Sequence, residues 1–181
     1  MTLINKAREF ARAKHITQIR KYTFEPYFVH LEEVAGLVER AGLSETAIAA
    51  AWLHDAIEDQ DVKIEEIITE FGAHVAYLVF DLTDVPASKG LNRDTRKKMD
   101  VSRLSLAMPD AQGIKCADLI SNTSTIVKYD PGFARQYLPE KRAVLGVLTR
   151  APDSLKQQAW ASLQQAEEDL GLVGDRAIIR R

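Results

Sequence analysis

The spacing of apolar residues limits the folds open to this chain more than any other feature of the sequence. Apolar side chains recur at every third or fourth position through most of the 181 residues, and convincing alternation with a period of two is absent. A recurrence of three and four places side chains on one face of an α-helix, whereas a half-buried strand alternates. The sequence therefore predicts an all-α protein.

Prolines, glycines and capping residues mark where the predicted helices begin and end. Pro26 suits the first turn of one helix, Ser44 can cap the next, and Asp61 can cap a third. The helices are expected over residues 3–15, 26–41, 45–58, 61–71, 73–82, 94–107, 111–127, 139–150 and 154–169. We expect a loop over 84–92 and a frayed tail after Gly171.

Length, charge and cysteine content narrow the class of protein further. A chain of this length can bury a core without disulfides, so we expect one domain over residues 1–181, with its core in about 3–150. The balance of 24 basic against 26 acidic residues offers no general attraction for nucleic acid or for an anionic membrane. Cys116 is the single cysteine, and the first helix is too charged for a signal peptide, so the expected location is the cytoplasm.

Four polar side chains lie at the end of the apolar helix predicted over 45–58 and just beyond it. On one helix His54 and Glu58 lie one turn apart, and Asp55 and Asp59 do likewise one step around. Burying such groups without a partner costs several kcal/mol, and a divalent cation is the simplest shared counter-charge. His30 and Asp118 are two further candidate ligands inside apolar helical patterns. Two imidazoles and two carboxylates suit Mn²⁺, Fe²⁺ or Zn²⁺ better than Ca²⁺, and one such ion is expected.

The order of histidine, histidine-aspartate and aspartate on successive helices resembles the HD-domain metal-dependent phosphohydrolases. The resemblance is carried by His30, His54-Asp55 and Asp118. Over about residues 3–150 the chain also resembles the hydrolase domain of RelA/SpoT homologues, in particular the small alarmone hydrolases of Mesh type. The matching segments are His15-Ile-Thr-Gln-Ile-Arg-Lys, Pro26-Tyr27, Leu53-His-Asp-Ala-Ile-Glu-Asp, Phe71-Gly and Leu82-Thr.

This resemblance implies an HD-domain helical bundle and a role for each matching residue. The implied reaction removes the 3′-pyrophosphate of guanosine tetra- and pentaphosphate, with one Mn²⁺ per chain and a small nucleotide as the partner. The implied metal ligands are His30, His54, Asp55 and Asp118, and the implied water-activating pair is Glu58 and Asp59. The implied nucleotide contacts are Arg20, Lys21, Asn122, Thr125 and Lys141.

Some positions depart from the family pattern and leave other substrates open. Leu31 replaces the usual proline after the first ligand, residues 22–25 replace a polar turn that contains glycine, and Ser124 replaces a basic residue. Adenosine analogues of the alarmones, the 2′-phosphate of NADPH and nucleoside 5′-phosphates remain alternatives. A further alternative is a non-catalytic HD module that binds a nucleotide.

The other polar and aromatic residues are expected to play no part in the site. The basic residues over 93–98 are expected to form a solvated face. Trp52 is expected in the core, and His15 and His74 are expected to be structural or surface residues. No feature of the sequence sets an oligomeric state.

Overall fold

A computed structural model of the chain describes residues 1–84 and 90–172. Within these residues the regular elements are helices, and the only β-type pairing is an isolated antiparallel bridge between Ile19 and Pro26. The all-α prediction is therefore confirmed. The predicted loop over 84–92 and the predicted frayed tail lie largely outside the described residues.

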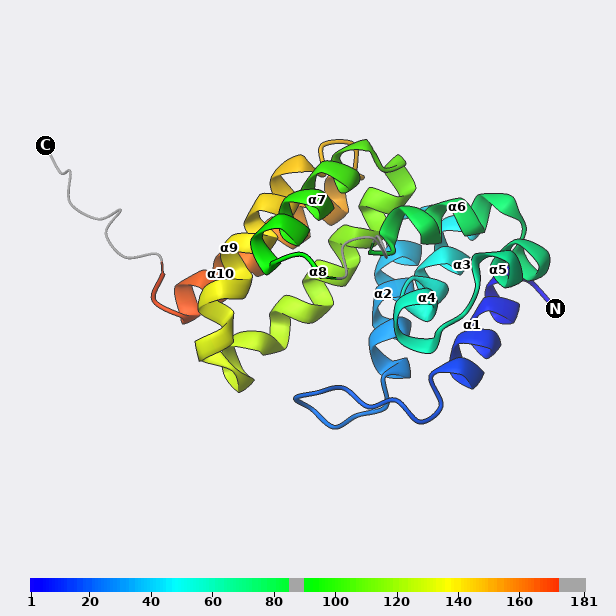
Figure 1. The fold of residues 1–181 in the computed structure, drawn as a ribbon, viewed down its shortest axis with the longest axis horizontal. Helices are drawn as coiled ribbons and strands as arrows, with labels where there is room; N and C mark the ends of the chain where they lie inside the picture. The colour runs from blue at the N-terminus through cyan, green and yellow to red at the C-terminus, as the bar shows by residue number, and fades with distance from the viewer. Residues whose placement is uncertain (85–89, 173–181) are drawn as a thin grey trace, which may run out of the picture.

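The helices form two groups on either side of one long helix. They are α1 (Leu3–Lys14), α2 (Phe28–Arg40), α3 (Glu45–Leu53), α4 (Ala56–Gln60), α5 (Ile64–Phe71), α6 (Ala73–Leu82), α7 (Arg93–Leu106), α8 (Pro109–Tyr129), α9 (Pro131–Val147) and α10 (Asp153–Asp169). Figure 1 shows α1 to α6 gathered at one end of the molecule and α7, α9 and α10 at the other. Helix α8 runs between the groups and packs against α2, α3, α6, α9 and α10.

Side-chain caps fix several helix starts, as the sequence predicted for one of them. The Ser44 hydroxyl accepts a hydrogen bond of 3.1 Å from the Ala47 amide at the start of α3. Asp130 caps α9 in the same way by accepting from the Phe133 amide at 3.0 Å. Each cap satisfies an amide that the first turn of a helix leaves without a backbone partner.

Several predicted helix boundaries are wrong, and three of them have a clear local reason. The helix expected over 139–150 begins at Pro131, because proline is favourable in a first turn, and it continues through Pro139 to Val147. Asp61 does not cap α5. It takes a left-handed φ of 51° that ends α4, and α5 starts at Ile64. Helix α2 starts at Phe28, because Pro26 pairs with Ile19.

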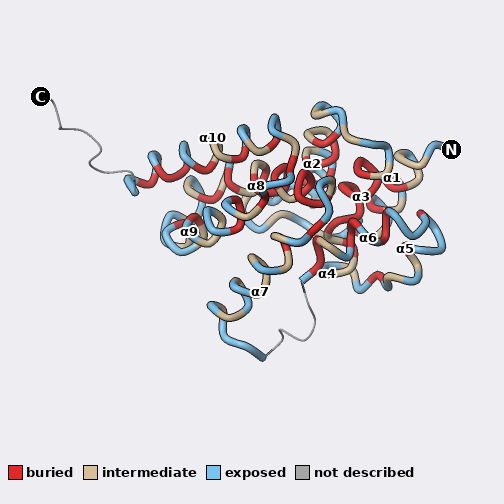
Figure 2. Tube along the Cα trace, turned by 90° about the horizontal axis from the view of Figure 1, so that it is seen from above, coloured by how far each residue is buried: buried red, intermediate tan, exposed pale blue. Residues whose placement is uncertain are grey.

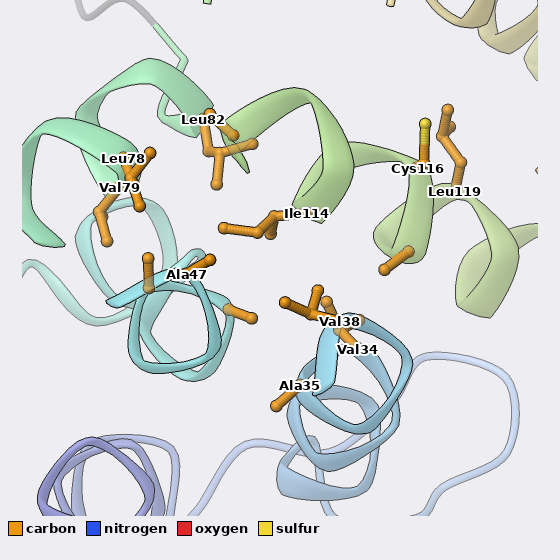
Figure 3. Packing of buried hydrophobic residues seen from close by; sticks show 14 of the residues in the cluster. Val34, Ala35, Val38, Ala47, Leu78, Val79, Leu82, Ile114, Cys116 and Leu119 are labelled. Carbon is orange, nitrogen blue, oxygen red and sulfur yellow. The ribbon is translucent and has the colours of Figure 1, made fainter. Parts of the chain in front are cut away.

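Small side chains in α3 allow the central helices to approach one another. Every residue of α3 from Ala47 to Leu53 is buried, including the core residue Trp52. Figure 2 shows α3 buried along most of its length, whereas α7 is largely exposed or intermediate. In Figure 3, Ile114 of α8 points into the space among α2, α3 and α6. This packing holds α2, α3 and α8, the helices that carry the candidate ligands, at fixed positions.

Within the described residues, no helix combines the length and the apolar character needed to cross a membrane.

Candidate functional site

The four predicted metal ligands meet at one point in the structure. His30 comes from α2, His54 and Asp55 from the turn between α3 and α4, and Asp118 from α8. The Nε2 atom of His30 lies 3.6 Å from Asp55 Oδ2 and 3.5 Å from Asp118 Oδ1. The Nε2 atom of His54 lies 3.0 Å and 3.9 Å from the same two oxygens. Both imidazoles therefore point these nitrogens at both carboxylates.

Hydrogen bonds on the far side of each imidazole determine which nitrogen carries the proton. His54 Nδ1 lies 2.8 Å from the Ala51 carbonyl oxygen, which can only accept, so Nδ1 carries the hydrogen. His30 Nδ1 lies 2.9 Å from the Ser121 hydroxyl, and that hydroxyl donates its own hydrogen to Glu33 Oε2. Ser121 must then accept from His30, so in both rings Nε2 offers a lone pair when the ring is neutral.

These two Nε2 atoms suit a cation. Both are buried and have no hydrogen-bond partner among the described residues. An unpaired buried polar atom costs about 1–3 kcal/mol, which is a reason to expect a partner that is absent from the protein itself. His30, His54 and Asp55 can each direct one ligand atom at a common metal ion. The donor set of imidazole nitrogens and carboxylate oxygens therefore fits a divalent transition metal.

The electrostatics of the cluster also favour positive charge at its centre. Burial lowers the pKa of His54, but Asp55 and Asp118 outweigh this effect and raise it to about 9. Burial raises the pKa of Asp118, but Lys115 and the two histidines lower it to about 2. The cluster thus holds ionised carboxylates in a buried place, where a cation stabilises them.

The helix predicted over 45–58 is interrupted at the ligands themselves. Helix α3 ends at Leu53 and α4 begins at Ala56, so His54 and Asp55 lie in the turn between them. In a continuous helix the Asp55 amide would bond to the Ala51 carbonyl, the group that the His54 side chain occupies. Tyr27 also holds Asp55, because its hydroxyl donates to Asp55 Oδ2 at 2.5 Å.

Lys115 is a residue of the site that the sequence reasoning missed. Its Nζ atom lies 2.7 Å from Asp118 Oδ2, whereas Oδ1 faces the histidines and accepts a hydrogen bond of 2.5 Å from Asn122 Nδ2. The available signal was a spacing of three on one helix, which places Lys115 and Asp118 on the same face.

The structure separates the predicted water-activating pair. Glu58 lines a cavity beside the ligands, and its carboxylate accepts a hydrogen bond from the Asp84 amide. Burial raises the pKa of Glu58 to about 7. Asp59 lines neither of the two cavities at the ligands, and its Oδ2 accepts from Gln18 Nε2 at 2.8 Å. Glu58 is therefore the better placed of the two to reach a bound substrate.

A cavity of about 390 Å³ adjoins the ligands and gathers the predicted nucleotide contacts. All five of these residues line it together with Asp55 and Asp118, namely Arg20, Lys21, Asn122, Thr125 and Lys141. Aromatic side chains form part of its wall, and Lys21 Nζ lies 4.7 Å from the centre of the Tyr22 ring and 5.8 Å from that of Phe133. We call this space the nucleotide cavity, because flat aromatic faces beside cations suit a base joined to phosphates.

The turn that presents Arg20 and Lys21 has an unusual backbone. Phe24 adopts a φ of 59°, in the left-handed region that bulky residues seldom occupy. Backbone hydrogen bonds close the turn, from the Arg20 amide to the Glu25 carbonyl and from the Phe24 amide to the Arg20 carbonyl. This is the segment in which the chain departs from the glycine-containing turn of the family.

A second cavity of about 210 Å³ lies on the other side of Asp55, Lys115 and Lys141, which line both. Lys97 and Arg103 of α7 add two more cations to its wall. The expectation that the basic residues over 93–98 all form a solvated face is therefore wrong for Lys97. Burial lowers the pKa of Lys141 to about 8, and no carboxylate in the described part of the chain lies within ion-pair distance of it.

The remaining residues singled out from the sequence lie away from the ligands or behind them. His74 and Ser124 are exposed, whereas Leu31 and Cys116 are buried in the core. His15 is buried behind the site, with its Nδ1 2.6 Å from Gln18 Oε1 and its ring stacked on Tyr27.

Comparison with known proteins is consistent with this geometry. A family model described as HD domain matches residues 7–137. The chain is 32% identical over 171 residues to mouse guanosine-3′,5′-bis(diphosphate) 3′-pyrophosphohydrolase MESH1, covering 92% of this chain and 94% of that protein. It is 35% identical over 129 residues to human MESH1, covering 70% of each. A guanosine-3′,5′-bis(diphosphate) 3′-pyrophosphohydrolase of Aquifex aeolicus is 35% identical over 123 residues, which are 18% of its length.

Solved structures show the same fold. A metazoan orthologue of SpoT, reported to hydrolyse ppGpp, superposes with a TM-score of 0.81 at 25% identity and covers 91% of this chain and 96% of its own. A protein of Listeria monocytogenes EGD-e superposes with a TM-score of 0.66 at 23% identity. The second likeness concerns the fold alone.

Proposed function

The chain belongs to the HD domain family, and we propose that it is a metal-dependent enzyme that hydrolyses the 3′-pyrophosphate of guanosine tetra- and pentaphosphate. The products are GDP or GTP and pyrophosphate. The observation that carries the proposal is the meeting of His30, His54, Asp55 and Asp118 beside a cavity lined by all five predicted nucleotide contacts. The likeness to MESH1 over nearly the whole chain supports the same reaction. A cytoplasmic location and a single domain over residues 1–181 stay predictions.

We propose Mn²⁺ as the metal, with one ion per chain held by the two imidazole Nε2 atoms and by the carboxylates of Asp55 and Asp118. Such an ion would supply positive charge to the phosphoryl group under attack and would lower the pKa of the attacking water. Tyr27 orients Asp55, and Lys115 orients Asp118 through the second oxygen of that carboxylate. Such outer contacts keep ligand atoms in the geometry that binding requires.

The side chains around the ligands divide the remaining work. Glu58 accepts a proton from the attacking water, and a pKa of about 7 suits a general base that works near neutral pH. Arg20 and Lys21 bind the nucleoside part in the nucleotide cavity, with Asn122 and Thr125 on the same wall. Lys141 lines both cavities and pairs with the phosphates of the substrate. These phosphates provide the negative charge that no described carboxylate places beside it.

Product analysis tests the reaction directly. With guanosine tetraphosphate, Mn²⁺ and ¹⁸O-labelled water, ³¹P spectroscopy should show GDP and pyrophosphate as first products, with the label in pyrophosphate. This pattern requires water to attack the phosphorus joined to the ribose 3′-oxygen and to break that P–O bond. Label in the nucleoside would instead mean cleavage of the C–O bond.

Other products or substrates would overturn the proposal. Orthophosphate as the first product would place the attack at a terminal phosphorus. A substrate panel with adenosine alarmones, NADPH and nucleoside 5′-monophosphates separates the remaining alternatives. Metal-depleted protein provides the background rate, and binding of guanosine tetraphosphate without turnover at saturating Mn²⁺ would favour a non-catalytic module.

Lys141→Arg is expected to remove an alkaline limb from the pH profile of kcat/KM, which reports ionisations of the free enzyme. The free wild-type protein loses the Lys141 charge as the pH rises through its pKa of about 8, and phosphate binding weakens with it. Arginine keeps its charge over that range, so the profile of the variant should stay level where the wild-type profile falls. Lys128→Arg, at an exposed position outside both cavities, is the control. A limb that persists in Lys141→Arg would assign the ionisation to another group.

A further inference from the structure

A chain of polar contacts links a candidate metal ligand to a candidate nucleotide contact. It begins at His30 Nδ1, which lies 2.9 Å from the Ser121 hydroxyl. Ser121 donates to Glu33 Oε2 at 2.5 Å, and the same carboxylate oxygen lies 3.8 Å from Nη1 of Arg20. The chain thus crosses from the buried ligands to the wall of the nucleotide cavity.

The inner part of this series of contacts is buried, so its polar groups depend on one another rather than on water. His30 is 1% exposed and Ser121 is fully buried, so both depend on each other for hydrogen bonding. Ser121 has one hydrogen to donate, and the Glu33 carboxylate can only accept it. This fixes the direction of both hydrogen bonds and makes His30 the donor to Ser121 through Nδ1.

The ion pair between Glu33 and Arg20 contributes little to the stability of the fold by itself. The Glu33 side chain is 39% exposed, and solvent screens an ion pair at such a position. Glu33 is nevertheless the one carboxylate within 4.0 Å of the Arg20 guanidinium among the described residues. Its effect is therefore on where the guanidinium lies.

We propose that Ser121 and Glu33 are positioning residues that hold His30 for metal binding and Arg20 for nucleotide binding. The proposal rests on the function proposed above, because it assigns both His30 and Arg20 to that site. Without Ser121, His30 is free to move its hydrogen to Nε2, where it would block the atom that faces the metal. Without the Glu33 charge, Arg20 is free to leave the cavity wall.

Three variants distinguish the effect at His30 from the effect at Arg20. Ser121→Ala removes the partner of His30 and should weaken Mn²⁺ binding by roughly 10–100-fold, as loss of a contact behind a ligand typically does. Glu33→Gln still accepts the Ser121 hydrogen but lacks the charge, so Mn²⁺ affinity should remain while KM rises. Glu33→Ala removes both functions, and both effects should appear together. We therefore expect Glu33→Gln to bind Mn²⁺ more tightly than Glu33→Ala does. A merely structural defect at position 33 would not produce this difference.

Glu32→Gln is the matched control, because Glu32 is the neighbouring carboxylate of α2. Its side chain is 54% exposed and lies 3.5 Å from Arg8, away from Ser121 and Arg20. It should keep wild-type metal affinity and kinetics. Thermal melting of each variant checks that it is folded.

The readouts distinguish failure of this inference from failure of the proposed function. Imidazole ¹⁵N spectra of metal-free protein at alkaline pH should show His30 with its hydrogen on Nδ1, and Ser121→Ala should move it. Mn²⁺ titration followed by electron paramagnetic resonance measures the affinity without any substrate. Absence of Mn²⁺ binding or of nucleotide turnover in the wild-type protein would overturn the proposed function.

Two results would overturn the inference alone. The first is wild-type Mn²⁺ affinity in both Ser121→Ala and Glu33→Ala, with an unchanged His30 spectrum. The second is an unchanged KM in Glu33→Gln when Arg20→Ala raises KM.

Discussion

His54→Ala is expected to lose the bound metal and all measurable turnover with it. The substitution removes one of the two unpaired Nε2 atoms of the site, and Asp55 loses the group 3.0 Å from its Oδ2. Elemental analysis of protein prepared with Mn²⁺ should return one equivalent for the wild type and none for the variant. Chelation should also lower the melting temperature of the wild type, because a ligand of the folded state stabilises it by mass action. His74→Ala, at an exposed histidine, should change none of these values.

Asp118→Ala should lose the metal as well, but it also leaves Lys115 without its anion. Breaking a buried ion pair by removing one partner costs roughly 3–5 kcal/mol. The double variant Asp118→Ala with Lys115→Met should recover stability and still bind no metal. Two metals per chain in the wild type, or full occupancy in His54→Ala and Asp118→Ala, would contradict the assigned ligands.

Glu58→Gln is expected to keep the metal and lose most of its turnover. The substitution keeps the shape of the side chain and its contact with the Asp84 amide, but it removes the proton acceptor. Loss of a positioned acid-base group typically lowers the rate by roughly 10²–10⁴-fold. The measurements are kcat at saturating Mn²⁺ and metal content, and near wild-type turnover would contradict the assigned base.

Asp59→Asn tests the other half of the predicted pair. Gln18 holds the Asp59 carboxylate outside both cavities, so we expect a smaller loss than in Glu58→Gln. Asp61→Asn is a suitable control, because Asp61 is exposed and asparagine tolerates its left-handed backbone.

Local patterns determined most of the fold, and they failed where two signals competed. The spacing of apolar residues and the Ser44 cap predicted real elements, because these effects act within one or two helical turns. Pro131-Gly132 lies between the helices predicted over 111–127 and 139–150, where it resembles a break, although the same proline is favourable in the first turn of α9. The break at His54 depends on a side chain that competes for a backbone carbonyl, which apolar spacing does not reveal.

The site was predictable only in part from the residues themselves. Spacing brings His54 and Asp55 close to Glu58, but nothing local connects them with His30 or Asp118. His30 and Asp118 are candidates because each lies inside an apolar helical pattern, and the resemblance to a family implies that they share one metal ion with the other two ligands. The structure brings them to the same point. A charged helix looks alike in sequence whether it faces solvent or a cavity, so the contribution of α7 to the second cavity was missed. The packing of α7 against α9 and α6 decides that question.

Helix α8 carries side chains for both cavities, so the number of residues between these side chains is as important for the site as their identity. The residues that α8 contributes follow one another at spacings of three or one, on the side of the helix that faces the site, and they are Lys115, Asp118, Ser121, Asn122 and Thr125. One inserted residue would turn everything beyond it by about 100°, and the metal ligand, the Ser121 contact and the nucleotide contacts would be displaced together. A substitution changes a single contact. In evolution this segment can therefore vary its specificity one position at a time, whereas insertions and deletions within it should be eliminated.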